Sequence, residues 1–263
     1  MSSLHEEQGE QRHESLDLLK SAIREHDYLS SYQDIFDDAL LLGFLHGKKY
    51  NVPSTLDCLK QYMYVRTEKY KKFTKTYLLP SRASILDIRS MNFLKQMDPQ
   101  RRTVICGTLM CSVYETMAYH AFVMDEALRS YLGDTESNEF VTIFNFDGWV
   151  LRQGLQFTPR VALQIVDFVL KSVPIRPAAF HLVNAGSIID FMMRIFKHLL
   201  PTKIQNRIFI DSNCAQLHEH LPPEILPKSL GGVLENEEAF RTELPDKIRS
   251  QEEFYQKLIE FSD

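Results

Sequence analysis

The stretch FVTIFNF, residues 140–146, is the clearest strand signal in the chain, because β-branched and aromatic side chains dominate it. Three shorter runs of the same kind lie at Thr103 to Cys106, Ala179 to Val183 and Arg207 to Ile210, and segments with helical spacing separate them. Strands that alternate with helices pair into a largely parallel sheet with crossover helices. The sequence therefore predicts an α/β fold.

The part of the chain before these strands has only helical periodicity. Apolar side chains recur at helical spacing in three runs, which begin near Leu16, Ile35 and Leu56. The first dozen residues, in contrast, are polar and charged. The predicted organisation is a disordered tail over residues 1–13, an all-helical N-terminal domain over residues 14–76 and an α/β domain over residues 77–263.

Length and composition restrict the class of protein. The chain has 263 residues, of which 44% are hydrophobic and 25% charged, as in an ordinary globular protein. Its net charge of −5 gives no general basic field for nucleic-acid binding. No apolar run approaches the roughly 18 to 20 residues that span a bilayer. Four cysteines without C-x-x-C spacing, together with a polar start, predict a cytoplasmic protein with reduced thiols.

Motifs that would indicate an enzyme, a cofactor or a metal are absent from the sequence. Neither G-x-G-x-x-G nor the P-loop motif G-x-x-x-x-G-K-[ST] occurs. Ser187 follows a glycine, but Ile189 occupies the position where the nucleophile elbow of a hydrolase needs a second glycine. His218 and His220 are two residues apart, whereas zinc ligands on one helix face are three or four apart. We therefore expect no catalytic residue, no cofactor and no metal site.

The run from Ile188 to Leu200 predicts a helix with two apolar sides. Nine of its thirteen residues are Ile, Phe, Met or Leu. The polar residues share one side of a helical wheel, so the apolar surface is wider than the stripe that docks a surface helix on a core. Either the helix is buried on both sides, or it covers a core or ligand with one side and meets a membrane or partner with the other.

A second helical run, from Ser112 to Tyr131, carries two polar groups on its apolar face. Thr116 and His120 lie one turn apart among apolar residues. Because buried hydroxyl and imidazole groups need hydrogen-bond partners, the pair suits the polar end of an otherwise apolar ligand. The alternative is a core histidine that bonds to a backbone carbonyl. Lys203 and Arg207 likewise fit either an anion site or an ordinary charged surface.

Five ordered blocks of sequence resemble the CRAL-TRIO lipid-binding domain. They are residues 140–149 (FVTIFNFDGW), 174–176 (PIR), 181–184 (HLVN), 203–208 (KIQNRI) and 226–232 (LPKSLGG). The run from Asp38 to Tyr50 also resembles the helical leader of that family. Within the family, the chain resembles the α-tocopherol transfer and cellular retinaldehyde-binding branch, and Gln156 to Pro159 resembles its arthropod-like members.

This resemblance implies a mixed, mostly parallel sheet that floors a hydrophobic cavity, with a movable helical gate that would be the run from Ile188 to Leu200. Ligand contacts are then expected at Val113, Thr116, Met117, His120, Met124, Ile143, Phe180, Leu182, Ile188, Phe191, Met192 and Ile195. Membrane contacts of the gate are expected at Phe191, Met192, Ile195 and Phe196. In the tocopherol-transfer branch a basic cleft binds a phosphoinositide headgroup, and the matching positions here are Lys48, Arg176, Lys203 and Arg207.

The function that the resemblance implies is that of a soluble intracellular carrier. It would bind one hydrophobic ligand of the tocopherol, retinoid or carotenoid class and exchange it at membranes by opening the gate. The expected partners are this ligand and, transiently, a phosphoinositide-containing membrane surface. We expect a monomer without enzymatic activity that binds no nucleic acid. The alternative is a signalling or trafficking module that recognises phosphoinositides and is recruited to membranes.

Overall fold

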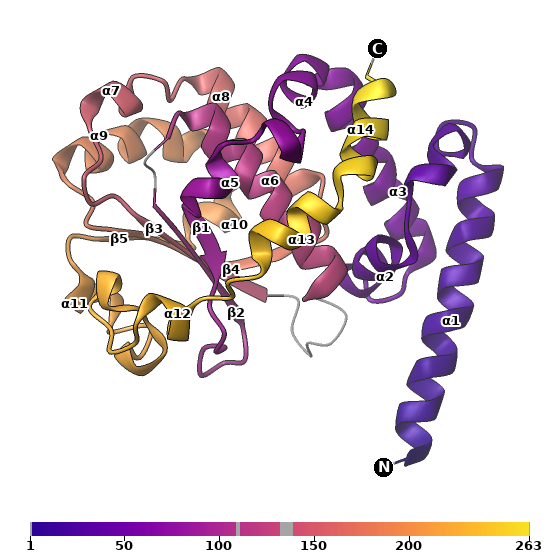
Figure 1. The fold of residues 1–263 in the computed structure, drawn as a ribbon, viewed down its shortest axis with the longest axis horizontal. Helices are drawn as coiled ribbons and strands as arrows, with labels where there is room; N and C mark the ends of the chain where they lie inside the picture. Colours follow the sequence, from indigo (N-terminus) through magenta and orange to yellow (C-terminus); the bar gives the residue numbers. More distant parts are fainter. Residues whose placement is uncertain (1, 109–110, 132–138, 263) are drawn as a thin grey trace.

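The computed structural model describes residues 2–108, 111–131 and 139–262, and a five-stranded sheet lies at its centre (Figure 1). The strands, in spatial order, are β1 (Met91–Phe93), β2 (Thr103–Thr108), β3 (Glu139–Asn145), β4 (Arg176–Val183) and β5 (Ile208–Asp211). β2 to β5 pair in parallel, and β1 pairs with β2 antiparallel. The predicted α/β class is confirmed, with one short edge strand that the sequence analysis did not include.

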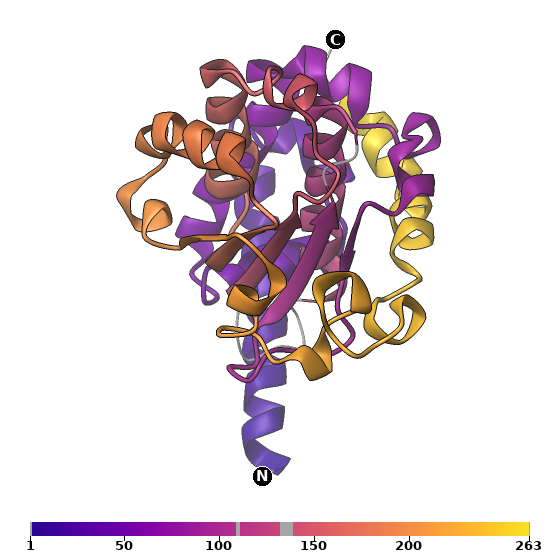
Figure 2. The same cartoon turned by 90° about the vertical axis from the view of Figure 1, so that its left-hand side faces the viewer.

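The two faces of the sheet are covered by different parts of the chain (Figure 2). One face carries Phe144 and Leu182 and lies under α6 (Val113–Ser130), and we call it the α6 face. The opposite face carries Ile143 and Val183 and packs on the segment that contains α12 (Asn236–Ala239), and we call it the α12 face. This division follows from the alternation of side chains along a strand.

The remaining helices of the α/β part are short. On the α6 face they are α7 (Leu151–Gly154), α8 (Pro159–Ile165), the π-helix η4 (Val166–Lys171), α9 (Ser187–Phe196), η5 (Lys197–Leu199) and α10 (Thr202–Gln205). Towards the C-terminus they are α11 (Cys214–Leu217), η6 (Pro223–Ile225), η7 (Lys228–Leu230), α13 (Leu244–Ser250) and α14 (Glu252–Glu260). In the part of the chain that the structure describes, no helix has both the length and the apolar character needed to span a membrane.

The N-terminal part is helical, as the periodicity predicts. Its elements are α1 (Ser2–Glu25), η1 (Ser30–Ile35), α2 (Asp38–Gly47), α3 (Val52–Met63), the π-helix η2 (Tyr64–Lys69), α4 (Lys71–Tyr77), η3 (Pro80–Arg82) and α5 (Ile85–Ile88). Side-chain caps begin two of these helices: Asp37 Oδ1 accepts a hydrogen bond from Leu40 N at 2.7 Å, and Asn51 Oδ1 accepts one from Ser54 N at 2.9 Å.

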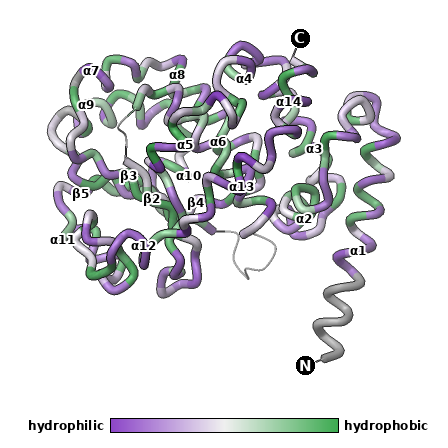
Figure 3. The backbone as a smooth tube through the Cα atoms, viewed as in Figure 1, coloured by the Kyte–Doolittle hydropathy of each residue, from purple (hydrophilic) through white to green (hydrophobic). Residues whose placement is uncertain are grey.

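The structure differs from the predicted organisation at both boundaries. α1 begins at Ser2, so residues 2–13 lie within a helix where a disordered tail was expected, and the Glu, Gln and Arg residues that dominate this segment have high helix propensity. The N-terminal helices also share one hydrophobic core with α6, α13 and α14, so the packing shows no division at residue 76. Hydrophobic and hydrophilic residues alternate along α14 and along the coloured, C-terminal part of α1, as expected of helices that pack by one side (Figure 3).

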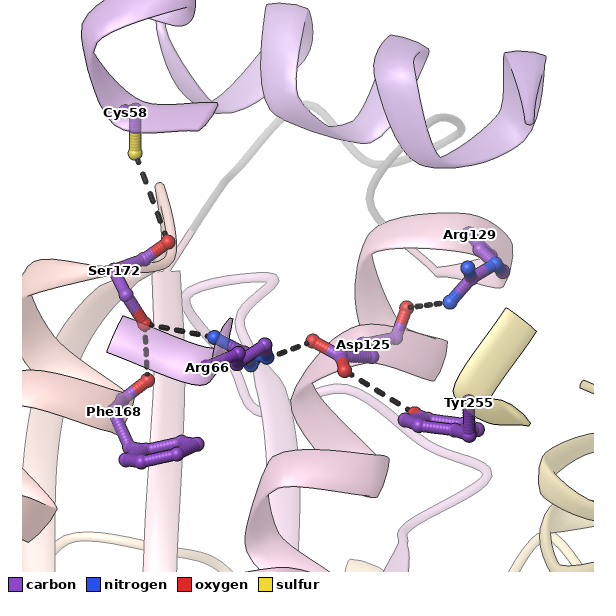
Figure 4. Close-up of polar contacts among 7 residues, drawn as sticks. All are labelled: Cys58, Arg66, Asp125, Arg129, Phe168, Ser172 and Tyr255. Atoms are coloured by element: carbon purple, nitrogen blue, oxygen red, sulfur yellow. Dashed lines mark hydrogen bonds and ion pairs between the residues drawn. The ribbon is translucent and has the colours of Figure 1, made fainter. Parts of the chain in front are cut away.

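A buried polar network joins these helices at the centre of the shared core (Figure 4). Arg66 of η2 and Asp125 of α6 are both fully buried, and Arg66 Nη2 lies 3.1 Å from Asp125 Oδ1. Arg66 Nη1 donates to Ser172 Oγ at 3.1 Å, and the hydroxyl of Tyr255 in α14 donates to Asp125 Oδ2 at 3.2 Å. The network therefore connects η2, α6, the end of η4 and the C-terminal helix, and it holds in place the frame on which α6 faces the sheet.

Candidate ligand-binding cavity

A cavity of about 240 Å³ lies between the α6 face of the sheet and the helices above it. Its floor is formed by Phe144 of β3, Phe180 and Leu182 of β4, and Ile208 of β5. Phe144 and Leu182 are partners in the β3–β4 register, so the two side chains stand next to each other on one face. Parallel strands with large apolar side chains thus give the cavity a continuous apolar floor.

The helix α6 forms one wall of the cavity, and α9 covers it. α6 contributes Val113, Thr116, Met117 and His120, whose spacing of three and four residues places them on one side of the helix. α6 begins at this end with a capping box, in which Ser112 Oγ accepts from Glu115 N and the Glu115 carboxylate accepts from Ser112 N. The cap fixes the first turn, and with it the orientation of the side chains that face the cavity.

α9 covers the cavity with the inner of its two apolar sides. Ile189, Met192, Met193 and Phe196 line the cavity at helical spacing. The ring of Phe196 also packs edge-on against Phe157, with 4.9 Å between the ring centroids. The helix has no side-chain cap at its N-terminus, where Gly186 occupies the cap position.

Seven of the twelve predicted ligand contacts line this cavity: Val113, Thr116, Met117, His120, Phe180, Leu182 and Met192. Four others do not. Met124 lies one turn beyond His120 and is buried in the core shared with the N-terminal helices, and Ile143 faces the α12 side because Phe144 occupies the cavity side of β3. Phe191 and Ile195 lie on the outer side of α9. The side chain of Ile188 lies outside the described residues.

The cavity has further lining residues that the sequence analysis did not single out. They include Phe146, Trp149, Phe157, Ile165, Val166, Val169 and Leu170. The turn-rich segment between β3 and α8 supplies the first three, the last residue of α8 is Ile165, and the π-helix η4 supplies the others. A strand or α-helix pattern does not reveal which side chains of such segments face inward, so only the general apolar character of the region was available as a signal.

His120 is the main polar group inside the apolar cavity. Its side chain is buried, its ring lies 6.1 Å from that of Phe144, and it has no hydrogen-bond partner among the described residues. A hydrogen bond to a backbone carbonyl, which the alternative interpretation requires, is therefore absent from this part of the chain. Burial lowers the pKa of His120 to about 4, so its imidazole is neutral and offers one N–H donor and one acceptor nitrogen.

Acidification should destabilise the fold through His120. The unfolded chain binds a proton near the ordinary imidazole pKa of 6.5, whereas the folded chain does so only near 4. The stability that the neutral ring contributes is therefore complete above pH 6.5 and is lost as the pH falls towards 4, with a total of roughly 3 kcal/mol. We expect His120→Gln to flatten this part of the stability profile, measured by urea unfolding between pH 7 and 4.5. The same change at the exposed His198 is the control, and an equal slope in both variants would contradict the assignment.

The outer side of α9 belongs to an exposed apolar surface. Phe191 and Ile195 are 64% and 50% exposed, and Val150, Leu155 and Leu163 of the neighbouring α7–α8 region are also exposed. α7 and α9 are in contact, and both lie beside α8 at the same edge of the molecule (Figure 1). We call these five residues the outer apolar patch. Of the four predicted membrane contacts, Phe191 and Ile195 lie in this patch, whereas Met192 and Phe196 face the cavity.

The four predicted headgroup contacts lie near the start of β4: Lys48, Arg176, Lys203 and Arg207. α2 brings Lys48 to this place, since the backbone of the preceding residue, Gly47, packs directly against Pro174. Arg207 is half-buried, and its Nη1 donates a hydrogen bond to the carbonyl oxygen of Pro177. Arg176 and Lys203 are exposed, and Lys48 is half-buried. The described residues contain no cluster of three or more groups suited to hold a metal ion.

A mixed sheet with an apolar cavity under an amphipathic helix, preceded by a helical leader, defines an α/β domain built around an internal apolar site. The chain belongs to the CRAL/TRIO family, because the family model described as "CRAL/TRIO domain" matches residues 62–232. Its similarity to the tocopherol-transfer branch agrees with the resemblance seen in the sequence.

Curated relatives support the same family, and a solved structure shares the fold. The chain is 30% identical over 239 residues to mouse alpha-tocopherol transfer protein-like. This alignment covers 87% of this chain and 67% of the mouse protein. It is 26% identical over 211 residues to human clavesin-2, covering 75% of this chain and 62% of that protein. The crystal structure of Sfh5 matches 92% of this chain and 96% of its own with a TM-score of 0.53 at 11% identity, and so shares the fold.

Proposed function

We propose that the protein is a carrier that binds one small hydrophobic molecule in the cavity and exchanges it at membranes by movement of α9. The observation that carries this proposal is an apolar cavity covered by a helix whose outer side is also apolar and exposed. We propose a tocopherol, retinoid or carotenoid as the class of cargo, and the name of the mouse relative, alpha-tocopherol transfer protein-like, supports the first of these. The carrier would act in the cytoplasm as a monomer, without catalysis or a cofactor, and would meet membranes transiently.

The energy of burial explains why such a carrier needs a membrane. A ligand of this size hides roughly 500 Å² of apolar surface, which corresponds to about 12 kcal/mol before the costs of ordering are subtracted. Release into water would therefore be slow. Opening would expose the inner side of α9. A bilayer accepts both this apolar side and the ligand, so exchange is favourable there.

The polar groups restrict the cargo. Because His120 is neutral, it would hydrogen-bond a hydroxyl or carbonyl group, but it offers no charge to a carboxylate. Thr116, one turn away on the same side of α6, can complete the interaction. A mostly apolar molecule with one neutral oxygen at its end fits this arrangement.

The outer apolar patch gives the most specific test of exchange. Phe191→Asp combined with Ile195→Asp places two charges where α9 would enter the bilayer, and we expect the transfer of a fluorescent tocopherol between vesicles to slow at least tenfold. The affinity for the ligand should not change, because neither side chain lines the cavity. Val233→Asp, at a residue 60% exposed on the segment near α12, is the matched control. Unchanged transfer in the double variant would reject the membrane role of α9.

The basic residues favour a second candidate function, recruitment to membranes by a phosphoinositide headgroup. Each basic residue near an anionic leaflet contributes roughly 1 kcal/mol, which would outweigh the weakly acidic remainder of the chain. We expect Lys203→Glu to slow transfer from phosphoinositide-containing vesicles more than from neutral vesicles, with a dependence on salt. Equal slowing on both kinds of vesicle would remove the headgroup role. Vesicle binding that persists with an empty cavity would favour recruitment over carriage as the main function.

A further inference from the structure

A second cavity, of about 400 Å³, lies on the α12 face of the sheet, on the side away from the apolar cavity. Its walls are rich in amide and hydroxyl groups. The sheet and its immediate approach contribute Ser90, Asn92, Thr108 and Asn145, and residues 229–242 contribute the opposite wall. The two faces of one sheet thus border two cavities of opposite chemical character.

The strand ends explain why polar side chains gather here. Thr108 and Asn145 are partners in register at the carboxyl ends of the parallel strands β2 and β3. Clefts outside the carboxyl ends of parallel strands are common ligand sites in α/β folds. Asn92 of β1 is the register partner of Cys106, so it stands on the same face as that residue. Three adjacent strands therefore direct polar side chains to one place.

The side-chain oxygens of Asn92 and Asn145 already accept hydrogen bonds from the protein. Asn92 Oδ1 accepts from Phe93 N at 2.8 Å. Asn145 Oδ1 accepts from Asp147 N at 3.0 Å and from Asn184 Nδ2 at 2.8 Å. Both asparagines are 6% exposed, yet their Nδ2 groups have no hydrogen-bond partner among the described residues. Two largely buried residues therefore leave an N–H₂ donor free at the cavity.

The surroundings add further donors. The hydroxyl of Ser90, a residue only 8% exposed, also has no hydrogen-bond partner in the described part of the chain. The exposed Arg89 carries a positive charge at the rim, and its φ of 50° turns the chain sharply between α5 and β1. Glu237, on the opposite wall, is the one carboxylate among the lining residues. These donors border the cavity without a partner among the residues described, so a ligand rich in acceptors can form hydrogen bonds with them.

We propose that this cavity binds a small oxyanion, the phosphate or carboxylate group of a polar metabolite, through the Nδ2 groups of Asn92 and Asn145 and the hydroxyl of Ser90. Arg89 faces the charge of the oxyanion from the rim, and Glu237 opposes it. The site is separate from the apolar cavity, so it does not depend on the proposed carriage of a lipid.

Titration of the full chain with inorganic phosphate, followed by ¹⁵N NMR of the asparagine side-chain amides, tests this proposal. We expect saturable shifts of the Asn92 and Asn145 amide signals with a Kd on the order of 1 mM, since a bare anion makes few contacts. Asn92→Asp replaces the donor with an acceptor but keeps the oxygen that caps Phe93 N, and it should weaken binding at least tenfold. Glu237→Gln should strengthen binding. The absence of saturable shifts in the unmodified chain would overturn the proposal.

A pair of arginines gives a matched control. Arg89→Gly removes the rim charge at a positive φ that glycine adopts readily, so the fold should persist while phosphate binding weakens. Arg101→Gly makes the same change at a φ of 58° in the β1–β2 connection, away from the cavity, and should have no effect. Equal weakening in both variants would show a general charge effect and contradict the site. A parallel titration with citrate distinguishes a phosphate ligand from a carboxylate ligand. If citrate binds more strongly than phosphate, the ligand is a carboxylate.

Discussion

Filling the apolar cavity from its floor should abolish ligand binding without unfolding the protein. Leu182→Trp places an indole into the space of about 240 Å³ beneath α9, because Leu182 lies on the α6 face and lines the cavity. The ligand and the indole compete for the same volume, and close-packed interiors do not expand to accommodate both. We expect the affinity for a fluorescent tocopherol to fall at least a hundredfold.

The thermal midpoint distinguishes a filled cavity from a damaged core. Since the new side chain occupies a void, the midpoint of the ligand-free variant should stay the same or rise. Ile195→Trp adds the same side chain on the outer side of α9 and should leave binding intact. Undiminished binding by Leu182→Trp would mean that the ligand site lies elsewhere.

Removing Arg66 should cause the largest loss of stability in the chain. The Arg66 guanidinium also stacks on the ring of Tyr62, 3.6 Å from its centroid, so it is held by an ion pair, a hydrogen bond and a ring contact. Arg66→Met leaves the fully buried Asp125 carboxylate without its charged partner, a change that costs about 3–5 kcal/mol in comparable pairs. Urea unfolding at pH 7 measures the difference in the free energy of unfolding.

Two further variants separate the buried charge from general damage. Arg66→Met combined with Asp125→Leu removes both charges and should recover part of the lost stability, because two apolar side chains leave no buried charge without a partner. Arg249→Met breaks the exposed pair of Arg249 with Asp87 and should leave the stability nearly unchanged. A loss below about 1 kcal/mol for Arg66→Met would show that the network does not hold the helices together.

The parts of the fold that rest on local periodicity could be predicted from the sequence. The four parallel strands, α6 and α9 are continuous patterns of the kind that propensity and spacing describe. β1 has only three residues, and its pairing with β2 depends on a contact across the sheet edge. The expected α9 helix also ends at Phe196, and a 3₁₀ turn continues the run to Leu199. Short elements of this kind leave little signal in the sequence.

Contacts between distant residues could not be predicted. From the sequence, Asp167 has no evident partner, and Lys69 is expected on a solvated surface. In the structure, Lys69 Nζ lies 2.7 Å from Asp167 Oδ2. Burial alone would raise the pKa of Asp167, but hydrogen bonds from Lys69, Tyr70 and Lys171 hold it below its usual range. Arg66 and Asp125 are likewise 59 residues apart. Such pairs depend on how the helices pack against each other, and the pattern of a single sequence does not reveal this packing.

The choice between neighbouring residues in the site also depended on the tertiary structure. Both Ile143 and Phe144 are plausible cavity residues, and only the register with β4 determines that Phe144 stands beside Leu182. Phe191 and Met192 differ in the same way, because the rotation of α9 about its axis decides which side chain faces inward. The amphipathic character was visible in the sequence, but its orientation was not.

Native mass spectrometry of the purified full chain, followed by extraction into organic solvent, tests the proposed carriage most directly. After incubation with a mixture of tocopherol, retinal and a carotenoid, we predict one adduct per chain, whose mass matches a single apolar molecule recovered in the extract. The Leu182→Trp variant should lack this adduct. A spectrum that contains only the mass of the bare chain would contradict the account.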